Sequence, residues 1–367
     1  MFAATGLRTT VRQSPLLFYS MFTLLALALL IPILIPSLEY NFNRTCTQWY
    51  PLTKRSFTSA SGTNGNGHYN YSTNQSSSYS TSASPFSYKT AVAYQPKDRD
   101  DQIYRNLKDS LASPTGEDNY FITSLDNNDE IFAAVADGVG GWAERNYDSS
   151  AISRELCKAM GQLTSSSSIN KVTTPKQVLE VSFQKIKDDK IVQVGGTTAI
   201  VAHFQKDGVL KVANLGDSWC GVFRNETLVF QTKLQTVGFN APYQLSIIPD
   251  SLLKEAALKG SSYIQNVPSD ADEYTFQLQK NDIVMMATDG VTDNIITDDI
   301  SLFLKDESAQ IQKNLQNVTE KFVKKVVALS KDPNYPSLFS QELSKLTGKP
   351  YRGGKEDDIT VVVVKVE

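Results

Sequence analysis

The stretch Ile131-Phe-Ala-Ala-Val-Ala-Asp-Gly-Val-Gly-Gly-Trp142 determines how we interpret the rest of the chain. Six apolar residues run directly into Asp137, and glycines follow at positions 138, 140 and 141. A short apolar run bounded by glycines predicts a buried strand followed by a sharp turn. The strand carries Asp137 to the rim of a core, where a carboxylate must be paired or bound to a metal ion, because a lone buried charge is too costly. The alternative is an Asp that bonds only to its own turn.

Later segments repeat this combination of an apolar run and a carboxylate. Two are apolar runs that end in Gly-Asp or Asp-Gly, and near the C-terminus two aspartates open directly into the apolar run 359–366. Carboxylates at neighbouring strand ends would form an oxygen-rich pocket, which suits hard cations such as Mg²⁺ or Mn²⁺ better than zinc. The carboxylates concerned are Asp217, Asp289, Asp293, Asp357 and Asp358.

Length and composition exclude several classes of function. The chain has 367 residues and a formal net charge of -3, which suits one large domain with extensions and gives no electrostatic case for nucleic acid as a partner. It contains only two histidines, and its three cysteines show no metal-ligand spacing, so a zinc hydrolase lacks ligands. A Ser-His-Asp triad would have to depend on His203, with no nucleophile elbow in view. A Walker A loop is also absent from the sequence.

The N-terminus contains a long uncharged run. Residues 1–15 carry Arg8 and Arg12 and no acid, and Leu16–Leu38 then has no charge at all. About 20 apolar residues suffice to cross a bilayer, so we expect a single transmembrane helix over Leu16–Leu38, with a membrane as partner. The alternative is a cleaved signal peptide, but its apolar region is normally about 7–15 residues long, and no small-x-small cleavage site follows here.

Between this run and the C-terminal part of the chain, residues 39–87 are rich in Ser, Asn and Gly and predict a flexible linker. Within them, Lys54-Arg-Ser-Phe-Thr-Ser-Ala resembles the tail of a mitochondrial transit peptide. A single folded domain is expected over residues 88–367. Near its start, Lys97-Asp-Arg-Asp-Asp101 is interpreted as a solvent-exposed turn.

The folded domain alternates short β runs with amphipathic helices. Runs at 197–204, 209–215, 219–224 and 228–232 follow one another closely, which predicts antiparallel pairing. Helical patterns occupy 147–163, 175–190, 251–259, 299–306, 318–329 and 335–346. The apolar, loop-like stretch Gln235–Ile248 is a candidate lid or substrate surface. Strand clusters separated by helix pairs indicate α+β layers.

Six motifs then occur in order: Glu117-Asp118, Asp137-Gly-Val-Gly-Gly, Gly195-Gly-Thr-Thr-Ala, Gly216-Asp-Ser, Asp289-Gly-Val-Thr-Asp and Asp357-Asp-Ile-Thr. With them the chain resembles the metal-dependent protein phosphatases, the type 2C or PPM family, from about Lys97 to Glu367. Ser113-Pro-Thr-Gly-Glu-Asp-Asn, together with Asp-Gly-Val-Gly-Gly-Trp, is similar to the mitochondrial-type branch of that family.

The resemblance implies a fold and a set of metal ligands. The fold is an α+β sandwich of two antiparallel β-sheets flanked by helices, with two Mg²⁺ or Mn²⁺ ions at one end and a looser third site. By motif position, Asp137 would bridge both ions and the Gly138 carbonyl would bind one of them. Asp289 and Asp357 would hold the other ion, and with Asp137 they form the implied catalytic set. Glu117 and Asp118 match positions that bind metal-bound waters, and Asp217 and Asp293 match the third site.

The implied activity is hydrolysis of phosphoserine and phosphothreonine in phosphoprotein substrates by a metal-bridging hydroxide. Two departures from the family pattern affect the chemistry. Val139 stands where many members have the general-acid His, and Ser113 stands where many have an Arg that grips phosphate, so Arg99 and Arg105 are alternative phosphate-binding candidates. A smaller departure is Asp358 in place of the usual Asn.

The same departures leave other functions open. A pseudophosphatase, binding metal or a partner without turnover, is favoured by Val139 and Ser113 but opposed by the retained aspartates. A phosphohydrolase for small molecules is a third reading. For location, the family branch indicates mitochondria, whereas Leu16–Leu38 predicts a single-pass membrane protein, which could also lie at the endoplasmic reticulum or nuclear envelope.

Overall fold

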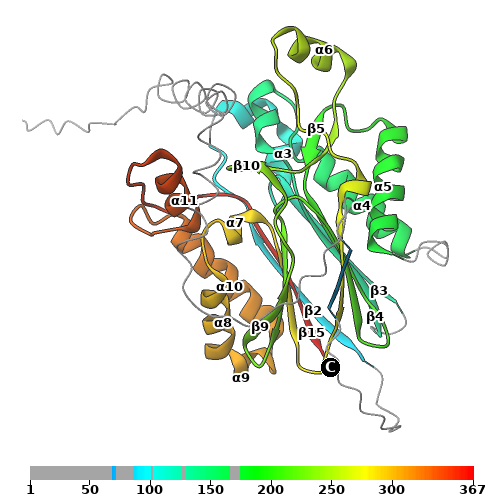
Figure 1. Cartoon of the computed structure of the whole chain (residues 1–367), viewed down its shortest axis with the longest axis vertical. Coiled ribbons are helices and arrows are strands. Elements are labelled where there is room, and N and C mark those ends of the chain that lie inside the picture. Colours follow the sequence, from blue (N-terminus) through cyan, green and yellow to red (C-terminus); the bar gives the residue numbers. More distant parts are fainter. Residues whose placement is uncertain (1–67, 72–85, 101, 126–128, 166–173) are drawn as a thin grey trace, which may run out of the picture. The chain divides into compact units, whose positions relative to one another are not determined.

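The computed structural model describes residues 68–71, 86–100, 102–125, 129–165 and 174–367. Every described residue belongs to one compact unit, Asn64–Glu367. This unit contains two large β-sheets with helices on their outer faces, as Figure 1 shows.

The larger sheet has six strands in the order β1-β13-β7-β6-β4-β3. Their bounds are β1 His68–Tyr71, β13 Asp272–Gln277, β7 Val209–Leu215, β6 Ala199–Phe204, β4 Glu130–Asp137 and β3 Asp118–Leu125. All neighbours are antiparallel except β1 and β13, which run parallel. The sequence does not predict β1, which lies within the expected linker at residues 39–87; the boundaries of that linker stay a prediction.

The second sheet has five antiparallel strands in the order β2-β15-β14-β8-β9. Their bounds are β2 Tyr88–Gln95, β15 Ile359–Val366, β14 Ile283–Ala287, β8 Trp219–Arg224 and β9 Thr227–Gln231. Two short pairs complete the β structure: β10 Thr236–Gly238 with β11 Ala241–Pro242, and β12 Leu245–Ile247 with β5 Gly195–Thr197.

Continuous apolar runs form the central strands because both faces of each sheet are buried. In β4, Ile131, Ala133 and Val135 belong to the cluster between the two sheets, whereas Phe132 and Ala134 pack on the helical side. The strand β15 alternates in the same way. The absence of polar alternation in these strands therefore follows from burial on two sides.

Helices cover the outer face of each sheet (Figure 1). α4 Ala151–Ser165 and α5 Pro175–Asp189 pack on the six-stranded sheet, and α8 Thr297–Asp306 and α10 Leu315–Ser330 on the five-stranded one. The remaining helices are α3 Lys108–Ala112, α6 Asp250–Leu258, α7 Asp289–Thr292, α9 Ser308–Ile311 and α11 Leu338–Thr347, with short 3₁₀ turns η1 Gln102–Asn106, η3 Gly140–Arg145 and η5 Pro268–Asp270. The expected α+β sandwich is therefore present.

The predicted transmembrane helix requires correction. Within the part of the chain that the structure describes, no helix combines the length and the apolar character that crossing a bilayer requires. The longest of these helices, α10, has 16 residues, about 24 Å, and it exposes lysines on one face. The stretch Leu16–Leu38 lies outside the described residues. In the described residues the fold is therefore the α+β sandwich alone, and these residues give no support to a membrane-spanning helix.

Candidate metal centre

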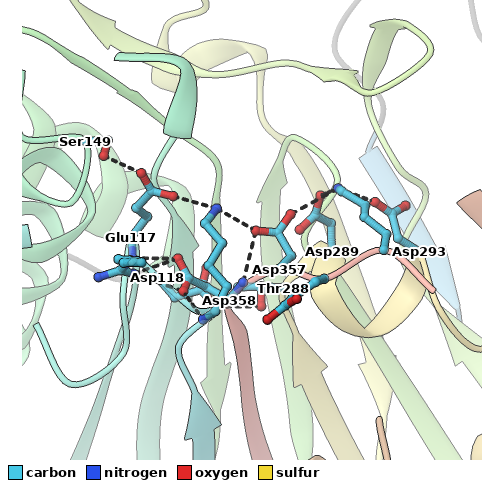
Figure 2. A network of polar contacts seen from close by, with 12 residues as sticks. Glu117, Asp118, Ser149, Thr288, Asp289, Asp293, Asp357 and Asp358 are labelled. Atoms are coloured by element: carbon cyan, nitrogen blue, oxygen red, sulfur yellow. Dashed lines mark hydrogen bonds and ion pairs between the residues drawn. The ribbon is translucent and has the colours of Figure 1, made fainter. Parts of the chain in front are cut away.

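The predicted carboxylates meet at one end of the two sheets because the strands that carry them are antiparallel neighbours. β4 ends at Asp137, directly opposite Asp118 at the start of β3. In the other sheet, the end of β14 lies beside the start of β15, so Asp289 and Asp357 come together. Figure 2 shows the resulting row of side chains, from Ser149 and Glu117 at one end to Asp293 at the other.

The turn after Asp137 is held by three backbone hydrogen bonds, one to Glu117 and two to the segment 196–198. Gly138 N donates to Glu117 O (3.1 Å), Val139 N donates to Gly196 O (2.9 Å), and Thr198 N donates to Asp137 O (2.9 Å). Gly138 tolerates no side chain, because a Cβ there would lie 2.4 Å from the backbone oxygen of Ser149. These contacts orient the end of β4, and the Gly138 carbonyl as a metal ligand remains a prediction.

Two lysines connect the acidic side chains of this row. Lys355 Nζ lies 2.7 Å from Asp289 Oδ2, 2.5 Å from Asp293 Oδ2 and 3.2 Å from Asp357 Oδ2. Lys97 Nζ lies 2.9 Å from Asp357 Oδ1 and 2.7 Å from Glu117 Oε2. The sequence analysis did not identify either lysine. Lys355 stands two residues before the motif that begins at Asp357, and this proximity is the one local signal that could have drawn attention to it.

A third cation, Arg99, neutralises Asp358. Arg99 Nη2 lies 2.9 and 3.0 Å from the two carboxylate oxygens of Asp358, and both side chains are almost fully buried. The same carboxylate accepts hydrogen bonds from the backbone N–H groups of Lys97 and Glu117 (2.8 Å each). The interpretation of residues 97–101 as a solvent-exposed turn was therefore wrong for Lys97 and Arg99. Because Arg99 is engaged with Asp358, the structure gives no support to a phosphate-binding role for it.

Glu117 lies at the end of the row nearest β4. Its side chain is 1% exposed, and Ser149 and Tyr104 both donate hydrogen bonds to its Oε1 atom, the latter at 3.2 Å. Its neighbour Asp118 accepts a hydrogen bond from Thr288 Oγ1 (2.8 Å), the residue directly before Asp289. These contacts join the start of β3 to the end of β14.

Burial and mutual repulsion raise the pKa of the carboxyl groups that no lysine contacts. The pKa of Asp137 lies well above its usual value because of burial and then the negative charges of Asp289 and Asp118. Burial and Asp358 raise the pKa of Asp118, and burial followed by Asp289 raises that of Asp217. Each of these groups would ionise more readily if positive charge were added nearby.

Lysines contact both Asp357 and Asp293, but the pKa values of these two carboxyl groups are shifted in opposite directions. Burial acts to raise the pKa of Asp357, but Lys97 and Lys355 outweigh it and lower the pKa to about 2. The pKa of Asp293 is raised to about 7 by burial and Asp289, although Lys355 contacts it. Asp357 thus remains ionised at neutral pH and is available as a ligand.

These residues fit a site for hard divalent cations. Asp118 Oδ1, Asp217 Oδ1 and Asp289 Oδ1 are buried and accept no hydrogen bond, and such oxygens require a partner. Within the described part of the chain, the cations that contact the cluster are Lys97, Arg99 and Lys355, so negative charge is in excess. No three acidic, histidine or cysteine side chains of that part are already grouped around one point, because the ammonium groups lie between them. The donor set is carboxylate oxygen, which suits Mg²⁺ and Mn²⁺.

Among the described residues, no nearby side chain takes over the roles of the His and the Arg that many family members have at the positions of Val139 and Ser113. Val139 presents an aliphatic side chain next to Gly196. Ser113 Oγ lies 3.4 Å from Thr115 Oγ1. His203 is bonded to Glu130 (2.5 Å), the first residue of β4, whereas Asp137 is the last. A strand rises about 3.3 Å per residue, so His203 is remote from the carboxylates.

The predicted lid contacts the acidic row. The hairpin β10–β11 lies within Gln235–Ile248, and Asn240 Oδ1 accepts a hydrogen bond from Lys355 Nζ (3.1 Å). The adjacent Phe239 packs against Phe339 of α11, with ring centroids 5.0 Å apart. The hairpin therefore borders the site, as a substrate surface would.

Gly116 provides a test of how tightly the site is packed. Its φ is +81°, and a Cβ atom would lie 2.0 Å from Arg99 Nη2 and 2.1 Å from Asp358 Oδ1. We expect Gly116→Ala to lower the free energy of unfolding by roughly 3 kcal/mol or more, since it adds displacement of a buried ion pair to backbone strain. Urea unfolding measures this change.

The matched control is Gly260→Ala. Gly260 has a similar φ of +68°, but nothing lies within 4 Å of a Cβ there. It should lose only about 1 kcal/mol, from backbone strain alone. Equal losses at the two positions would contradict the tight packing around Arg99 and Asp358.

Comparisons with known proteins identify a family and several relatives of this chain. The family model described as "Stage II sporulation protein E (SpoIIE)" matches residues 127–367. "Protein phosphatase 2C homolog 7, mitochondrial" from Saccharomyces cerevisiae is 62% identical over 329 residues, which cover 88% of this chain and 94% of that protein. "Protein phosphatase PTC7 homolog fig" from Drosophila willistoni is 33% identical over 269 residues, covering 71% and 82% of the two chains. The solved structure of the photosystem II phosphatase PBCP is 26% identical, with a TM-score of 0.59, and covers 76% of this chain and 99% of its own.

Proposed function

The chain belongs to the PP2C family of protein phosphatases, and from this premise we propose that the acidic row at the strand ends is its divalent-metal centre. The protein is a metal-dependent serine/threonine phosphatase. The observation that most strongly supports the proposal is the convergence of Asp137, Asp289 and Asp357 from two sheets, together with buried carboxylate oxygens that have no hydrogen-bond partner.

The proposed ligands follow the motif positions. Asp137 would contact both ions, with the Gly138 carbonyl on one and Asp289 and Asp357 on the other. Asp217 and Asp293 would form a looser third site. Glu117 and Asp118 would bind waters that the metal ions hold. Phosphate monoesters are among the slowest esters to hydrolyse, and two Mg²⁺ or Mn²⁺ ions, when bound, would activate water and neutralise phosphate charge.

The protein's own residues would prepare this centre. Lys97 links Glu117 and Asp357 by bonding to both, and Arg99 fixes the loop before β15 through Asp358. Asp357 is kept ionised by the lysines beside it. Val139 cannot donate a proton, so no side chain at that position would protonate the leaving group.

We also propose mitochondria as the location and phosphoproteins there as the substrates. The mitochondrial relative from S. cerevisiae supports this location. The basic, serine-containing segment that begins at Lys54 is consistent with it. Nothing comparable supports a membrane, the endoplasmic reticulum or the nuclear envelope as the location, and the phosphatase relatives favour an enzyme over a binding module without turnover.

The test is phosphate release by the purified full-length chain, with and without Mn²⁺, on p-nitrophenyl phosphate and on a phosphoserine peptide. We expect Mn²⁺-dependent hydrolysis of both substrates, abolished by a chelator. General acid catalysis typically contributes about 10²–10⁴-fold, so the substrate with the acidic leaving group should be favoured. Turnover that persists after complete metal removal would refute the proposed centre.

A further inference from the structure

We infer that Lys355 is a built-in counter-ion that competes with divalent cations for Asp289, Asp293 and Asp357, and so sets how much Mg²⁺ or Mn²⁺ the enzyme requires. The inference rests on the proposed metal centre, because it concerns the same carboxylates. Lys355 lies outside all six motifs, and the inference assigns it a function.

The geometry makes the ammonium and a metal ion mutually exclusive. Lys355 Nζ has carboxylate oxygens at 2.7, 2.5 and 3.2 Å and the Asn240 amide oxygen at 3.1 Å. An ammonium has three N–H donors, so these four acceptors occupy it fully. A Mg²⁺ ion binds oxygen at about 2.0–2.1 Å. It would have to take over the same carboxylate oxygens, and like charges at this separation repel.

Displacement of Lys355 would involve its side chain alone. Its backbone N–H donates to Asn294 Oδ1 (2.9 Å), and its carbonyl accepts from Asn294 Nδ2 (2.8 Å). Asn294 is 1% exposed, so this clamp belongs to the rigid part of the fold. Asp357, two residues further on, can therefore keep its position while the ammonium leaves. Lys97 differs, because its contacts are with Glu117 and Asp357 and not with Asp289.

The competition predicts a gain in metal affinity when the charge is removed. We expect Lys355→Met to bind Mn²⁺ about tenfold more tightly, which corresponds to about 1.4 kcal/mol. In the absence of metal this variant should have a lower Tm than the wild type, because three carboxylates lose their counter-charge. Its Tm should also rise more on adding Mn²⁺, since stabilisation by a bound ligand grows with the logarithm of the affinity.

The experiment titrates Mn²⁺ into chelator-treated full-length protein and measures free Mn²⁺ by electron paramagnetic resonance. Lys331→Met is the matched control, because Lys331 pairs with Asp98 and Glu356 outside the row and is 43% exposed. This control should change the Mn²⁺ dissociation constant less than twofold. If Lys355→Met does not fold without metal, Lys355→Gln, which keeps hydrogen-bond donors but no charge, is measured in its place.

The outcomes separate this inference from the proposed function. Tighter Mn²⁺ binding by the uncharged variant, with the control unchanged, supports the competition. Unchanged or weaker Mn²⁺ binding by Lys355→Met overturns the competition. If Asp289→Asn nevertheless loses Mn²⁺ binding, the proposed metal centre is still supported. Normal Mn²⁺ binding by Asp289→Asn would overturn the metal centre and the inference with it.

Discussion

Replacing Asp137 by Asn is expected to lower Mn²⁺-dependent phosphate release on the order of 10³-fold while leaving the fold intact. Asp137 ends β4, opposite Asp118, where the proposed ions would lie. Asparagine keeps the shape but removes the negative charge that a bridging ligand supplies, and loss of one preorganised charge-stabilising group typically costs about 10²–10³-fold. Initial rates on a phosphoserine peptide at saturating Mn²⁺ measure this loss.

Although Asp137→Asn should lower activity, it should leave the metal-free protein as stable as the wild type or more stable. Burial and neighbouring carboxylates raise the pKa of Asp137 in the folded protein. A carboxyl group whose pKa is raised in the folded state lowers stability progressively from its unfolded-state pKa up to the folded-state pKa, so metal-free stability should fall as the pH rises over that range. Asn cannot ionise, and the metal-free variant should have a Tm at neutral pH equal to or above that of the wild type.

The control for this prediction is Asp188→Asn, on the outer face of α5, which should alter neither rate nor Tm appreciably. A rate within tenfold of the wild type for Asp137→Asn would exclude Asp137 as a bridging ligand. A large drop in its metal-free Tm would show that the side chain has a structural partner instead.

Replacing Arg99 by Met is expected to cost about 3–5 kcal/mol of stability, because it leaves the buried carboxylate of Asp358 without its counter-ion. Arg99 and Asp358 side chains are 5% and 2% exposed, and their two contacts are 2.9 and 3.0 Å long. Urea unfolding at neutral pH measures the change. The loop that carries Asp357 should loosen as well, so Mn²⁺-dependent activity should also fall.

A second substitution tests the cause. Asp358→Asn in the Arg99→Met background removes the unpaired charge, and it should recover a substantial part of the lost stability. Arg105→Met, at an exposed position in η1, should change stability by less than about 0.5 kcal/mol. A double variant no more stable than Arg99→Met would mean that packing, rather than charge, explains the loss.

Much of the fold could be predicted from local patterns. The strands at 209–215 and 219–224 coincide with β7 and β8, since apolar runs bounded by turns identify strands wherever they lie. The helix predicted at 175–190 is observed as α5, which begins with a capping box at Thr174. The helix predicted at 147–163 instead begins at Ala151, because the chain before it is occupied by η3 and a turn.

The sequence predicts the acidic residues of the site but not the cations that contact them. Each carboxylate stands next to its own glycine or apolar run, so local sequence indicates it. The contact between Lys97 and Asp357 joins residues 260 positions apart. It arises because β2 and β15 are neighbours in one sheet. A charged residue in a turn is indistinguishable in sequence from a solvent-exposed one until its spatial neighbours are known.

The sequence by itself therefore determined the central strands, the helices that cover them, the family and the carboxylates available for metal. Those properties depend on hydrophobic period and on residues close together in the chain. Tertiary structure alone decided that Arg99 neutralises Asp358, that Lys97 joins Asp357 to Glu117, and that Lys355 lies where a cation is needed. The physical reason is that a charged side chain pairs with groups that strand pairing brings within about 3 Å of it. Local sequence does not specify which segments pair.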